Sequence, residues 1–477
     1  MSLAVFNPRT GESDYTIEPL DAAAIAELAK SLRKGQQTWA AMAPEERGNH
    51  LRSLAEAIER NREPLTAALT ADTGRSAISV IEVESVIRTL NRWARTAPEL
   101  IRQQQSSGDA TAIATITTST RLVPYALVGV ISPWNFPLTL ALIDAIPALA
   151  AGCSVLIKPS EVTPRFIRPL MRAIAEVPQV AAVLSLIEGD GRTGAAMLEH
   201  IDFVAFTGSV ATGRKVGESA ARAFIPASLE LGGKDPMLVL ASADPVKAAE
   251  TALRASVLNT GQACQSIERV YVARAIAEPF LAALVAGAKA VRLNVPDIRS
   301  GDIGPFIFAK QAEIVQAQID DAVAKGARVL AGGRVETIEG GKYLRPTVLV
   351  DVTTDMSLMT EETFGPVIPV TLFDTVEEAV AHANSGIFGL SAAVLAGSVE
   401  EAETVAARIN AGAVSINDGS LTGLVWEAEK SSFGHSGLGP SRMGDSGLLR
   451  FFRKQAIIRQ SGAALPLAAY SEEALRG

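Results

Sequence analysis

Phe203-Val204-Ala205-Phe206 runs directly into Thr207-Gly208-Ser209, and a segment of helical character then continues past Gly213. A short apolar run that ends in a glycine turn and continues as a helix predicts a buried strand and helix of an α/β unit. The backbone N–H groups at the start of that helix, together with the Ser209 hydroxyl, could hold a phosphate group. From these residues alone, a purely structural turn is the alternative.

The same alternation of strand and helix extends outward on both sides of this stretch. Between residues 125 and 240, further short apolar runs lie at 155–157, 183–187 and 229–231. A second series follows Cys264, with candidate strands at 270–272, 348–350, 367–370, 392–395 and 414–416. This rhythm predicts two α/β units, each built on a mostly parallel sheet. Residues 21–95 instead have apolar side chains every three or four positions, which predicts helices.

The composition argues against several classes of function. The chain has 477 residues, 48% of them hydrophobic, with 38 glycines and 24 prolines, which is typical of a large enzyme. A formal net charge of -8 without a basic run argues against binding to nucleic acid or to an anionic membrane. Two cysteines cannot build a disulfide framework, and four histidines without close spacing predict no metal site. We expect a cytoplasmic, metal-free protein that acts on small molecules.

Residues 122–143 carry no charged side chain and form a stretch long enough to cross a bilayer. The residues that interrupt this stretch are Pro124, Gly129, Pro133, Asn135 and Pro137. Because proline lacks the N–H that a continuous helix needs, we expect a strand at 125–131, a turn, and a helix from about Leu138. The first eight residues also lack the charged and apolar pattern of a secretory signal. The sequence therefore predicts neither a membrane span nor a signal peptide.

Two more turns between a strand and a helix have residue types suited to a nucleotide. Residues 189–194, Gly-Asp-Gly-Arg-Thr-Gly, have the spacing of the dinucleotide fingerprint in the required strand-turn-helix context. The match is weak because the acidic residue expected about twenty positions later is missing. Lys158 and Glu161 follow the apolar run at 155–157 and could bind two ribose hydroxyls. An ion pair in solvent is the alternative for these two side chains.

Three residues have the chemistry of an acyl-transfer site. Cys264 ends the turn 259–264 after a helical pattern, where a thiol can reach a substrate, although a buried structural cysteine is the alternative. Glu230 ends a predicted strand beside two glycines and could act as a general base or be a solvated carboxylate. Asn135 lies in the interrupted apolar turn, where its amide could stabilise an oxyanion or simply form the turn.

Two segments outside the α/β series have the character of strands. Residues 109–123 are rich in β-branched side chains, partly alternate and carry little charge, which predicts a hairpin or an extended arm. Residues 451–460 form another apolar, strand-like segment near the other end of the chain. We expect this second segment to pair with the early arm or with the sheet of a neighbouring subunit.

Six motifs, in their order along the chain, resemble those of the aldehyde dehydrogenase superfamily. They are Trp134-Asn135-Phe136-Pro137, Lys158-Pro159-Ser160-Glu161, Phe206-Thr207-Gly208-Ser209, Glu230-Leu231-Gly232-Gly233-Lys234, Gly261-Gln262-Ala263-Cys264 and Glu362-Thr363-Phe364-Gly365-Pro366. The resemblance covers nearly the whole chain, from Asn7-Pro8 to about Gly444. It implies an α/β fold with a Rossmann-like cofactor domain at 1–106 and 125–231 and a catalytic domain at 232–435. Residues 107–124 and 445–477 are then expected to form an oligomerisation arm and tail.

The resemblance also implies a catalytic cycle. Cys264 matches the nucleophile that attacks the aldehyde carbon and forms a thiohemiacetal. The Asn135 side chain and the Cys264 backbone N–H match the oxyanion hole that holds the developing alkoxide. Hydride transfer to a nicotinamide then leaves a thioester, and Glu230 matches the base that activates water to hydrolyse it.

NAD is the cofactor that the resemblance implies, with NADP as a possible second cofactor. Lys158 and Glu161 match the pair at the adenosine ribose, and the Glu161 carboxylate favours NAD because it would repel a 2′-phosphate. Ser209 and the turn from Gly208 to Gly213 match the pyrophosphate contact. The other residues expected to bind the cofactor are Ile131, Trp134, Gly191, Leu231, Glu362 and Phe364.

Phe136, Leu140 and Ile143 fall at helical spacing after the expected oxyanion asparagine. The resemblance implies that this apolar face lines the passage to the nucleophile, although a core face is the alternative. Because no arginine or lysine interrupts the face, we expect an apolar or aromatic aldehyde rather than a dicarboxylic semialdehyde. Gln265, next to the nucleophile, is polar and uncharged and fits both classes of substrate.

Other functions are compatible with the same motifs. A semialdehyde dehydrogenase, of the succinate semialdehyde type or of the CoA-acylating type, is one alternative, and Glu230 argues against acylation because a base is needed only for water. A non-catalytic binding protein with this fold is the other. Residues 432–440 depart from the family's glycine-rich pattern, so Trp426 or His435 could add substrate contacts. The arm is expected to join subunits into a homodimer or a homotetramer.

Overall fold

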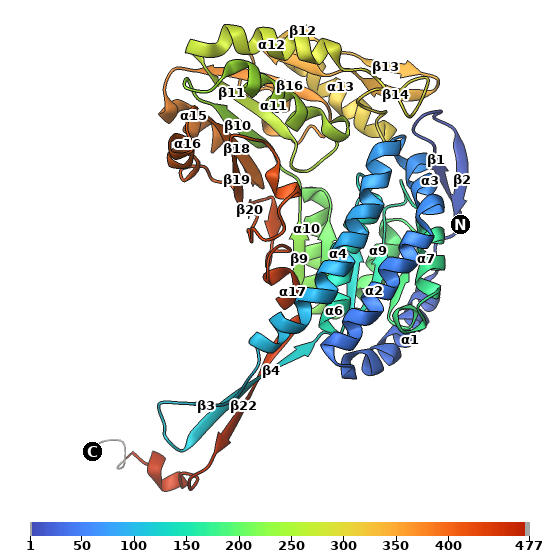
Figure 1. Ribbon diagram of the computed structural model, residues 1–477, viewed down its shortest axis with the longest axis vertical. Coiled ribbons are helices and arrows are strands. Elements are labelled where there is room, and N and C mark those ends of the chain that lie inside the picture. The colour runs from blue at the N-terminus through green and yellow to red at the C-terminus, as the bar shows by residue number, and fades with distance from the viewer. Residues whose placement is uncertain (1, 473–477) are drawn as a thin grey trace.

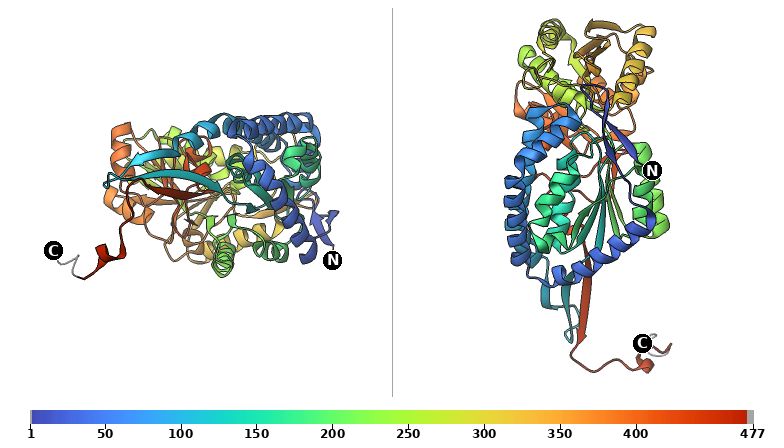
Figure 2. Two further views of the ribbon diagram at one scale, coloured as in Figure 1. Left: turned by 90° about the horizontal axis from the view of Figure 1, so that it is seen from below. Right: turned by 90° about the vertical axis from the view of Figure 1, so that its right-hand side faces the viewer.

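The computed structural model describes residues 2–472 and consists of two α/β lobes and a narrow arm (Figure 1). The arm leaves the lobe that contains helix α4 (Ser76–Gln103) and extends away from both lobes, as Figure 1 and the right-hand view of Figure 2 show. This architecture confirms the expected α/β fold with two sheets.

The sheet of the first lobe has six strands in the order β21-β9-β8-β5-β6-β7. All pairs are parallel except that between β21 and β9. The strands are β5 (Leu127–Ile131), β6 (Ser154–Lys158), β7 (Leu184–Leu186), β8 (Phe203–Thr207), β9 (Ala227–Glu230) and β21 (Gly437–Leu438). The five expected runs therefore form adjacent strands, and only β21 returns from a distant part of the sequence.

Both faces of this sheet are buried, which explains the continuous apolar runs. Phe203 and Ala205 belong to the core cluster on one face, whereas Val204 and Phe206 belong to the cluster on the other. The first face is covered by α2 (Pro44–Arg60), α4, α6 (Ala145–Ala151) and α7 (Ile167–Ala175), and the second by α1 (Ala22–Ala41), α9 (Gly191–Leu198) and α10 (Val210–Ala223). Together with α3 (Arg62–Thr73), helices α1 to α4 confirm the helical pattern expected for residues 21–95.

The second lobe contains a seven-stranded sheet in the order β12-β15-β16-β11-β10-β18-β19, parallel except for the edge strand β12. Its strands are β10 (Asp235–Val239), β11 (Ile267–Ala273), β12 (Arg328–Ala331), β15 (Thr347–Val350), β16 (Val367–Phe373), β18 (Ser391–Leu395) and β19 (Ala413–Ile416). Helices α11 (Pro245–Val257) and α12 (Ala277–Ala290) pack on one face. Helices α13 (Ala309–Ala324), α15 (Val376–Ala383) and α16 (Val399–Ala406) pack on the other. All five strands expected after Cys264 are present.

The arm is a three-stranded antiparallel sheet in the order β22-β4-β3. It consists of β3 (Ser106–Ala110), β4 (Ile116–Pro124) and β22 (Phe452–Gln460). The early hairpin is confirmed, and the late segment pairs with it in register from Phe452 opposite Pro124 to Gln460 opposite Ile116. The late part of the arm begins after the expected residue 445, because α17 (Ser446–Leu449) packs on α6 and Phe451 lies in the core of the first lobe.

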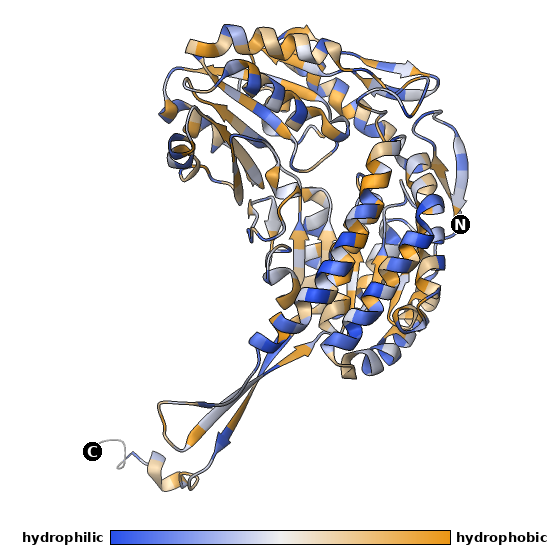
Figure 3. Ribbon diagram, in the orientation of Figure 1, coloured by the Kyte–Doolittle hydropathy of each residue, from blue (hydrophilic) through white to orange (hydrophobic). Residues whose placement is uncertain are grey.

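The apolar stretch at 122–143 divides as expected into β5, a turn and the short helix α5 (Pro137–Leu142). Within residues 2–472, every helix is too short or too polar to span a bilayer. Short antiparallel pairs lie outside the large sheets: β1 (Leu3–Phe6) with β2 (Ser13–Ile17), β13 (Val335–Ile338) with β14 (Gly341–Leu344), and β17 (Phe388–Gly389) with β20 (Phe433–Gly434). Apolar colour follows the strands of the large sheets, and polar patches alternate along the outer helices α2 and α4 (Figure 3).

Candidate active site

A cavity of about 640 Å³ lies where the carboxyl ends of the first sheet meet the second lobe. Ile131, Lys158 and Thr207, the last residues of β5, β6 and β8, all contribute to its wall. This edge is where open α/β sheets place their ligands. The expected site residues that line the cavity are Ile131, Trp134, Asn135, Leu140, Lys158, Glu161, Gly191, Gly208, Ser209, Leu231, Cys264, Glu362 and Phe364.

Cys264 is presented by an unusual turn after α11. Asn259, Thr260 and Gly261 all have left-handed backbone conformations, with φ of 60°, 58° and 68°. This conformation is costly for a β-branched residue such as threonine, so surrounding contacts must hold it. The Thr260 hydroxyl donates to the carbonyl of Gly304 (3.1 Å) and accepts from its N–H (3.2 Å). A Cβ on Gly261 would lie 2.2 Å from the carbonyl oxygen of Gly365, so only glycine fits there.

Asn135 lies directly against this turn. Its side-chain Nδ2 donates to the carbonyl of Gln262 (3.0 Å), which also accepts from Asn259 Nδ2 (2.9 Å). Only 3% of Asn135 is exposed, and its own carbonyl accepts from the Arg75 guanidinium (3.0 Å). A primary amide has two N–H donors, and one is used in the bond to Gln262. The contacts fix the amide beside the turn that carries the sulfur.

The surroundings of the Cys264 thiol favour its neutral form. Burial, followed by the nearby carboxylates of Glu362 and Asp235, raises the pKa of Cys264 to about 12. The positive charges of Arg442 and Lys430 act in the opposite direction. The thiol is therefore protonated at neutral pH, and it needs a base or a further positive charge before it can act as a nucleophile.

Glu230 lies at the end of β9, on the strand next to Thr207. Its backbone pairs in register with Thr207 on one side and with Gly437 of β21 on the other. The half-buried carboxylate accepts a hydrogen bond from the Ser432 hydroxyl (3.2 Å). Glu230 is not part of the cavity wall, although its strand neighbour Thr207 is.

In the Lys158–Glu161 pair the lysine is buried, whereas the Glu161 side chain is 42% exposed. Lys158 is 4% exposed, and its Nζ lies 3.4 Å from Glu161 Oε2 and donates to the Gly189 carbonyl (3.2 Å). Burial lowers the pKa of Lys158, and Glu161 opposes that shift. Gly191, the first residue of α9, lies in the same wall. The weak fingerprint and the lysine motif therefore meet at one end of the cavity.

The turn after β8 forms another part of the wall. Ser209 is the N-cap of α10, and its side chain accepts from the Thr212 N–H (3.3 Å). Gly213 is not part of the cavity wall, but Leu231 is. A Cβ on Gly213 would lie 2.4 Å from the Leu231 side chain, so the glycine allows α10 to pack closely against Leu231. Ser132 also lines the cavity, and within residues 2–472 its buried hydroxyl has no hydrogen-bond partner. Sequence reasoning did not select Ser132 as a site residue. Its place in the cavity wall and its buried hydroxyl oxygen are visible only in the structure.

Glu362 and Phe364 come from the second lobe and face the first. The Gly233 N–H donates to Glu362 Oε1 (3.2 Å), and burial followed by Glu268 raises the pKa of Glu362 to about 8. Phe364 has a left-handed backbone with φ of 55° and packs edge-on against Trp134, with ring centroids 5.4 Å apart. The two lobes thus contact each other across the cavity.

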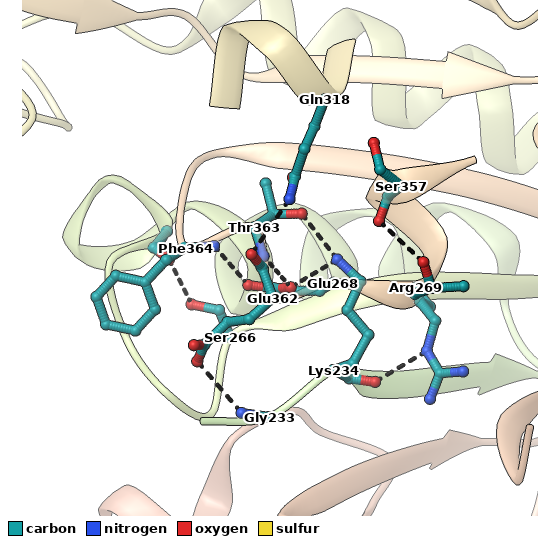
Figure 4. A network of polar contacts seen from close by, with 12 residues as sticks. Gly233, Lys234, Ser266, Glu268, Arg269, Gln318, Ser357, Glu362, Thr363 and Phe364 are labelled. Atoms are coloured by element: carbon teal, nitrogen blue, oxygen red, sulfur yellow. Dashed lines mark hydrogen bonds and ion pairs between the residues drawn. The ribbon is translucent and has the colours of Figure 1, made fainter. Parts of the chain in front are cut away.

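A buried ion pair holds the segment 362–364 in place (Figure 4). Lys234 Nζ lies 2.7 Å from Glu268 Oε2, and the two residues are 2% and 3% exposed. Glu268 also accepts from the N–H groups of Thr363 (2.8 Å) and Phe364 (2.7 Å), while Lys234 donates to the Thr363 hydroxyl (2.7 Å). Sequence reasoning missed Glu268, although a charged pair, Glu268-Arg269, inside an otherwise apolar strand was a usable signal.

Lys234→Met is expected to lower the free energy of unfolding by about 3 kcal/mol, because it leaves the Glu268 charge buried without its partner. Urea or thermal unfolding at fixed protein concentration measures this loss. Lys30→Met, in the exposed Lys30–Glu27 pair, is the matched control and should change stability little. The double variant Lys234→Met/Glu268→Gln should recover part of the loss, and equal stability of Lys234→Met and wild type would contradict the argument.

The three apolar residues expected to face the substrate are not core residues. Phe136, Leu140 and Ile143 are half-buried and lie outside the apolar clusters, whereas the intervening Leu138 and Leu142 are buried in the core. Of the three, Leu140 lines the cavity and the other two do not. The face is also closer to a cation than its sequence indicates, because the Arg75 guanidinium lies 5.8 Å from the centre of the Phe136 ring.

The remaining candidates lie away from the cavity. Gln265 accepts from the Thr422 hydroxyl, and its carbonyl accepts from Ser420 (2.8 Å), so it anchors the 420–423 loop instead of lining the cavity. Trp426 stacks on Arg92, whose guanidinium carbon lies 4.5 Å from the centre of the Trp426 ring. The His435 Nε2 lies 3.2 Å from a terminal nitrogen of Arg214. Among residues 2–472, no group of three or more His, Cys, Asp or Glu side chains could hold a metal ion.

The chain resembles known proteins both in sequence and in fold. The model described as "Aldehyde dehydrogenase family" matches residues 1–457. A Mycolicibacterium smegmatis protein named as a succinate-semialdehyde dehydrogenase (NADP(+)) is 36% identical over 94% of this chain and 87% of its own length. A solved structure from Anabaena variabilis, named as an aldehyde dehydrogenase, is 51% identical with a TM-score of 0.95, covering 98% and 99% of the two chains. Betaine aldehyde dehydrogenase from Staphylococcus aureus, solved with NAD+, is 29% identical with a TM-score of 0.91, covering 97% and 93%.

Proposed function

Because the chain belongs to the aldehyde dehydrogenase family, we propose that it oxidises an aldehyde to the carboxylic acid with NAD(P) through a covalent intermediate on Cys264. One observation carries the proposal. The turn that presents Cys264 is bonded to the Asn135 amide at the same cavity that the Lys158–Glu161 pair lines. The proposed nucleophile and the proposed nucleotide site therefore line the same cavity.

The reaction begins with addition of the Cys264 sulfur to the aldehyde carbon. As the C–S bond forms, the thiol proton passes to solvent water and the carbonyl π electrons move onto the oxygen. The second N–H of Asn135 and the Cys264 backbone N–H stabilise the negative oxygen that results. NAD(P), held by cavity residues such as Lys158, Glu161 and Glu362, would supply the hydride acceptor through which this adduct becomes a thioester on Cys264. Glu230 then removes a proton from a water molecule that attacks the thioester, and the carboxylic acid leaves as the Cys264 thiol is restored.

The lining of the cavity fits a dinucleotide. At one end, buried Lys158 and the Glu161 carboxylate offer a donor and an acceptor for ribose hydroxyls. The Ser132 hydroxyl and the Ser209 turn at the start of α10 line the same cavity and add further donors. At the other end, Glu362 would bind the second ribose, beside the aromatic wall of Phe364 and Trp134. The remaining residues proposed to contact the cofactor are Ile131, Gly191, Gly208 and Leu231, whereas Gly213 lies behind the wall and packs against Leu231.

NAD is the proposed preference, because Glu161 would repel the additional phosphate of NADP. Glu161→Gln is therefore expected to raise kcat/KM for NADP relative to NAD by roughly tenfold, equivalent to about 1.4 kcal/mol. Initial rates with each cofactor at a saturating aldehyde concentration measure the ratio. Glu218→Gln, an exposed change on α10 with the same loss of charge, should leave it unaltered. If the ratio of kcat/KM for NADP to that for NAD were unchanged in Glu161→Gln, residues other than Glu161 would select the cofactor.

An apolar or aromatic aldehyde is the proposed substrate class. Support comes from the half-buried face of Phe136, Leu140 and Ile143, which the apolar core leaves uncovered. A succinate semialdehyde is the second candidate, favoured by the name of the Mycolicibacterium relative and by Arg75. Close to Phe136, the Arg75 Nε and one terminal nitrogen are buried and have no hydrogen-bond partner in the part of the chain that the structure describes, so a substrate carboxylate could pair with them.

The assay that tests the function uses purified protein, NAD or NADP, and a panel of aliphatic, aromatic and semialdehyde substrates with and without CoA. We expect reduced cofactor and the free acid, without a requirement for CoA. Oxidation that depends on CoA would indicate an acylating enzyme, and absence of turnover with every aldehyde would favour a binding protein. The ranking of kcat/KM within the panel decides between apolar aldehydes and semialdehydes.

A homodimer, or a tetramer of two dimers, is the proposed assembly. The arm projects from the lobes (Figure 1). Ile457 and Ile458 on β22 are exposed, and a second subunit could cover them. Light scattering after size-exclusion chromatography gives the subunit number. A cytoplasmic location stays a prediction from the sequence.

A further inference from the structure

The Glu230 carboxylate is contacted by Ser432, the first residue of the unusual segment 432–440. Among the residues that the structure describes, the Ser432 hydroxyl is the one side-chain partner of the Glu230 carboxylate, at 3.2 Å between Oγ and Oε2. The two residues are 202 positions apart in the sequence. Ser432 also lies at the start of the segment in which the chain departs from the motifs that it otherwise matches.

The position of Ser432 is fixed by contacts that do not involve the Glu230 side chain. Directly after it, β20 pairs with β17, so that Phe433 lies opposite Gly389. Directly before it, the Ser431 carbonyl lies so close to Gly412 that a Cβ on that glycine would be 1.9 Å away. The hydroxyl is therefore presented by a backbone held on both sides.

The same segment also holds the backbone of the Glu230 strand. The Ser436 carbonyl accepts from the N–H of Leu231 (2.9 Å), and the Ser436 hydroxyl accepts from that of Gly389 (3.0 Å). Gly437 pairs with Glu230 in register, and a Cβ on Gly437 would lie 2.7 Å from that of Ser432. Strand β9 and the serine that faces its last side chain thus form one connected unit.

We propose that Ser432 is a positioning residue that donates a hydrogen bond to Glu230 and orients its carboxylate toward the water that hydrolyses the thioester. The inference rests on the proposed function, because Glu230 is the proposed base. A carboxylate at the end of a strand has free side-chain torsions, and one directed hydrogen bond restricts them. A hydroxyl that donates to an ionised carboxylate makes one of the stronger hydrogen bonds of a protein.

The test compares Ser432→Ala with Ser431→Ala, the adjacent exposed serine whose side chain has no contact with Glu230. Removing a hydrogen bond to a charged group is expected to slow steady-state turnover roughly 10- to 100-fold. The first-turnover burst of reduced cofactor should keep its amplitude, because hydride transfer precedes hydrolysis. Ser431→Ala should behave as wild type in both phases, and thermal unfolding of both variants checks the fold.

A double-mutant cycle with Glu230→Gln separates positioning from a general structural effect. If Ser432 acts through Glu230, adding Ser432→Ala to Glu230→Gln should cause no further loss of turnover. A loss that persists in that background, a burst that falls in parallel, or normal turnover of Ser432→Ala would each overturn the inference. Crystal structures of the wild type and of Ser432→Ala test the inference independently of any activity measurement. The Glu230 carboxylate should occupy a different position in Ser432→Ala from the one it has in the wild type. Absence of turnover in wild type would speak against the proposed function, whereas an unmoved Glu230 speaks against the role of Ser432.

Discussion

Cys264→Ala is expected to lower aldehyde oxidation by roughly 10⁴-fold or more, because removal of a covalent nucleophile leaves only binding and oxyanion stabilisation. The loss should appear in the first turnover as well as in the steady state, since no thiohemiacetal can form. Single-turnover measurements with excess enzyme, followed by absorbance of the reduced cofactor, test both statements. NAD binding, measured by calorimetry, should remain, because the residues proposed to hold the cofactor, such as Lys158 and Glu161, line the cavity independently of the Cys264 side chain.

The second cysteine of the chain provides the control. Cys153 is fully buried beside the carbonyl of Phe451, and burial raises its pKa far above the usual range. Cys153→Ala should therefore retain the rate of oxidation, with at most a modest loss of stability. Normal turnover of Cys264→Ala would refute a covalent mechanism at this sulfur.

Glu230→Gln is expected to separate the two halves of the reaction. Hydride transfer does not need the proposed base, so a burst of about one reduced cofactor per active site should remain. Steady-state turnover should fall by roughly 10²- to 10⁴-fold, the usual contribution of a general base, because water must then attack the thioester unaided. Rapid mixing followed by quenching and mass spectrometry should detect the acyl group on Cys264.

The comparison variant for Glu230 is Glu218→Gln, which removes a carboxylate from the exposed side of α10. It should retain both phases. Two results would reject Glu230 as the base: steady-state turnover of Glu230→Gln at the wild-type rate, or loss of the burst. In the second case, the carboxylate would be acting before hydride transfer.

The strands were predictable because each is a short apolar run bounded by turn residues, and the structure buries both faces of the sheets. The turn at Gly208-Ser209 was predictable for the same local reason, since a strand ends and a helix begins there. The partner of β22 was not settled, because a strand-like segment can pair with any free edge. The structure assigns it to β4 of the same chain.

The sequence by itself determined the two α/β units, the arm and the motif residues that meet at one cavity, because local pattern and motif order encode them. Only the tertiary structure decided which side chains support those residues. Arg75 reaches Asn135 across 60 positions, Lys234 reaches Thr363 across 129, and Ser432 reaches Glu230 across 202. Such contacts leave no periodic signal along the chain, because they depend on how two sheets and their loops pack together. The opening stretch at 203–213 therefore predicted the fold, whereas packing decided the chemistry around Cys264 and Glu230.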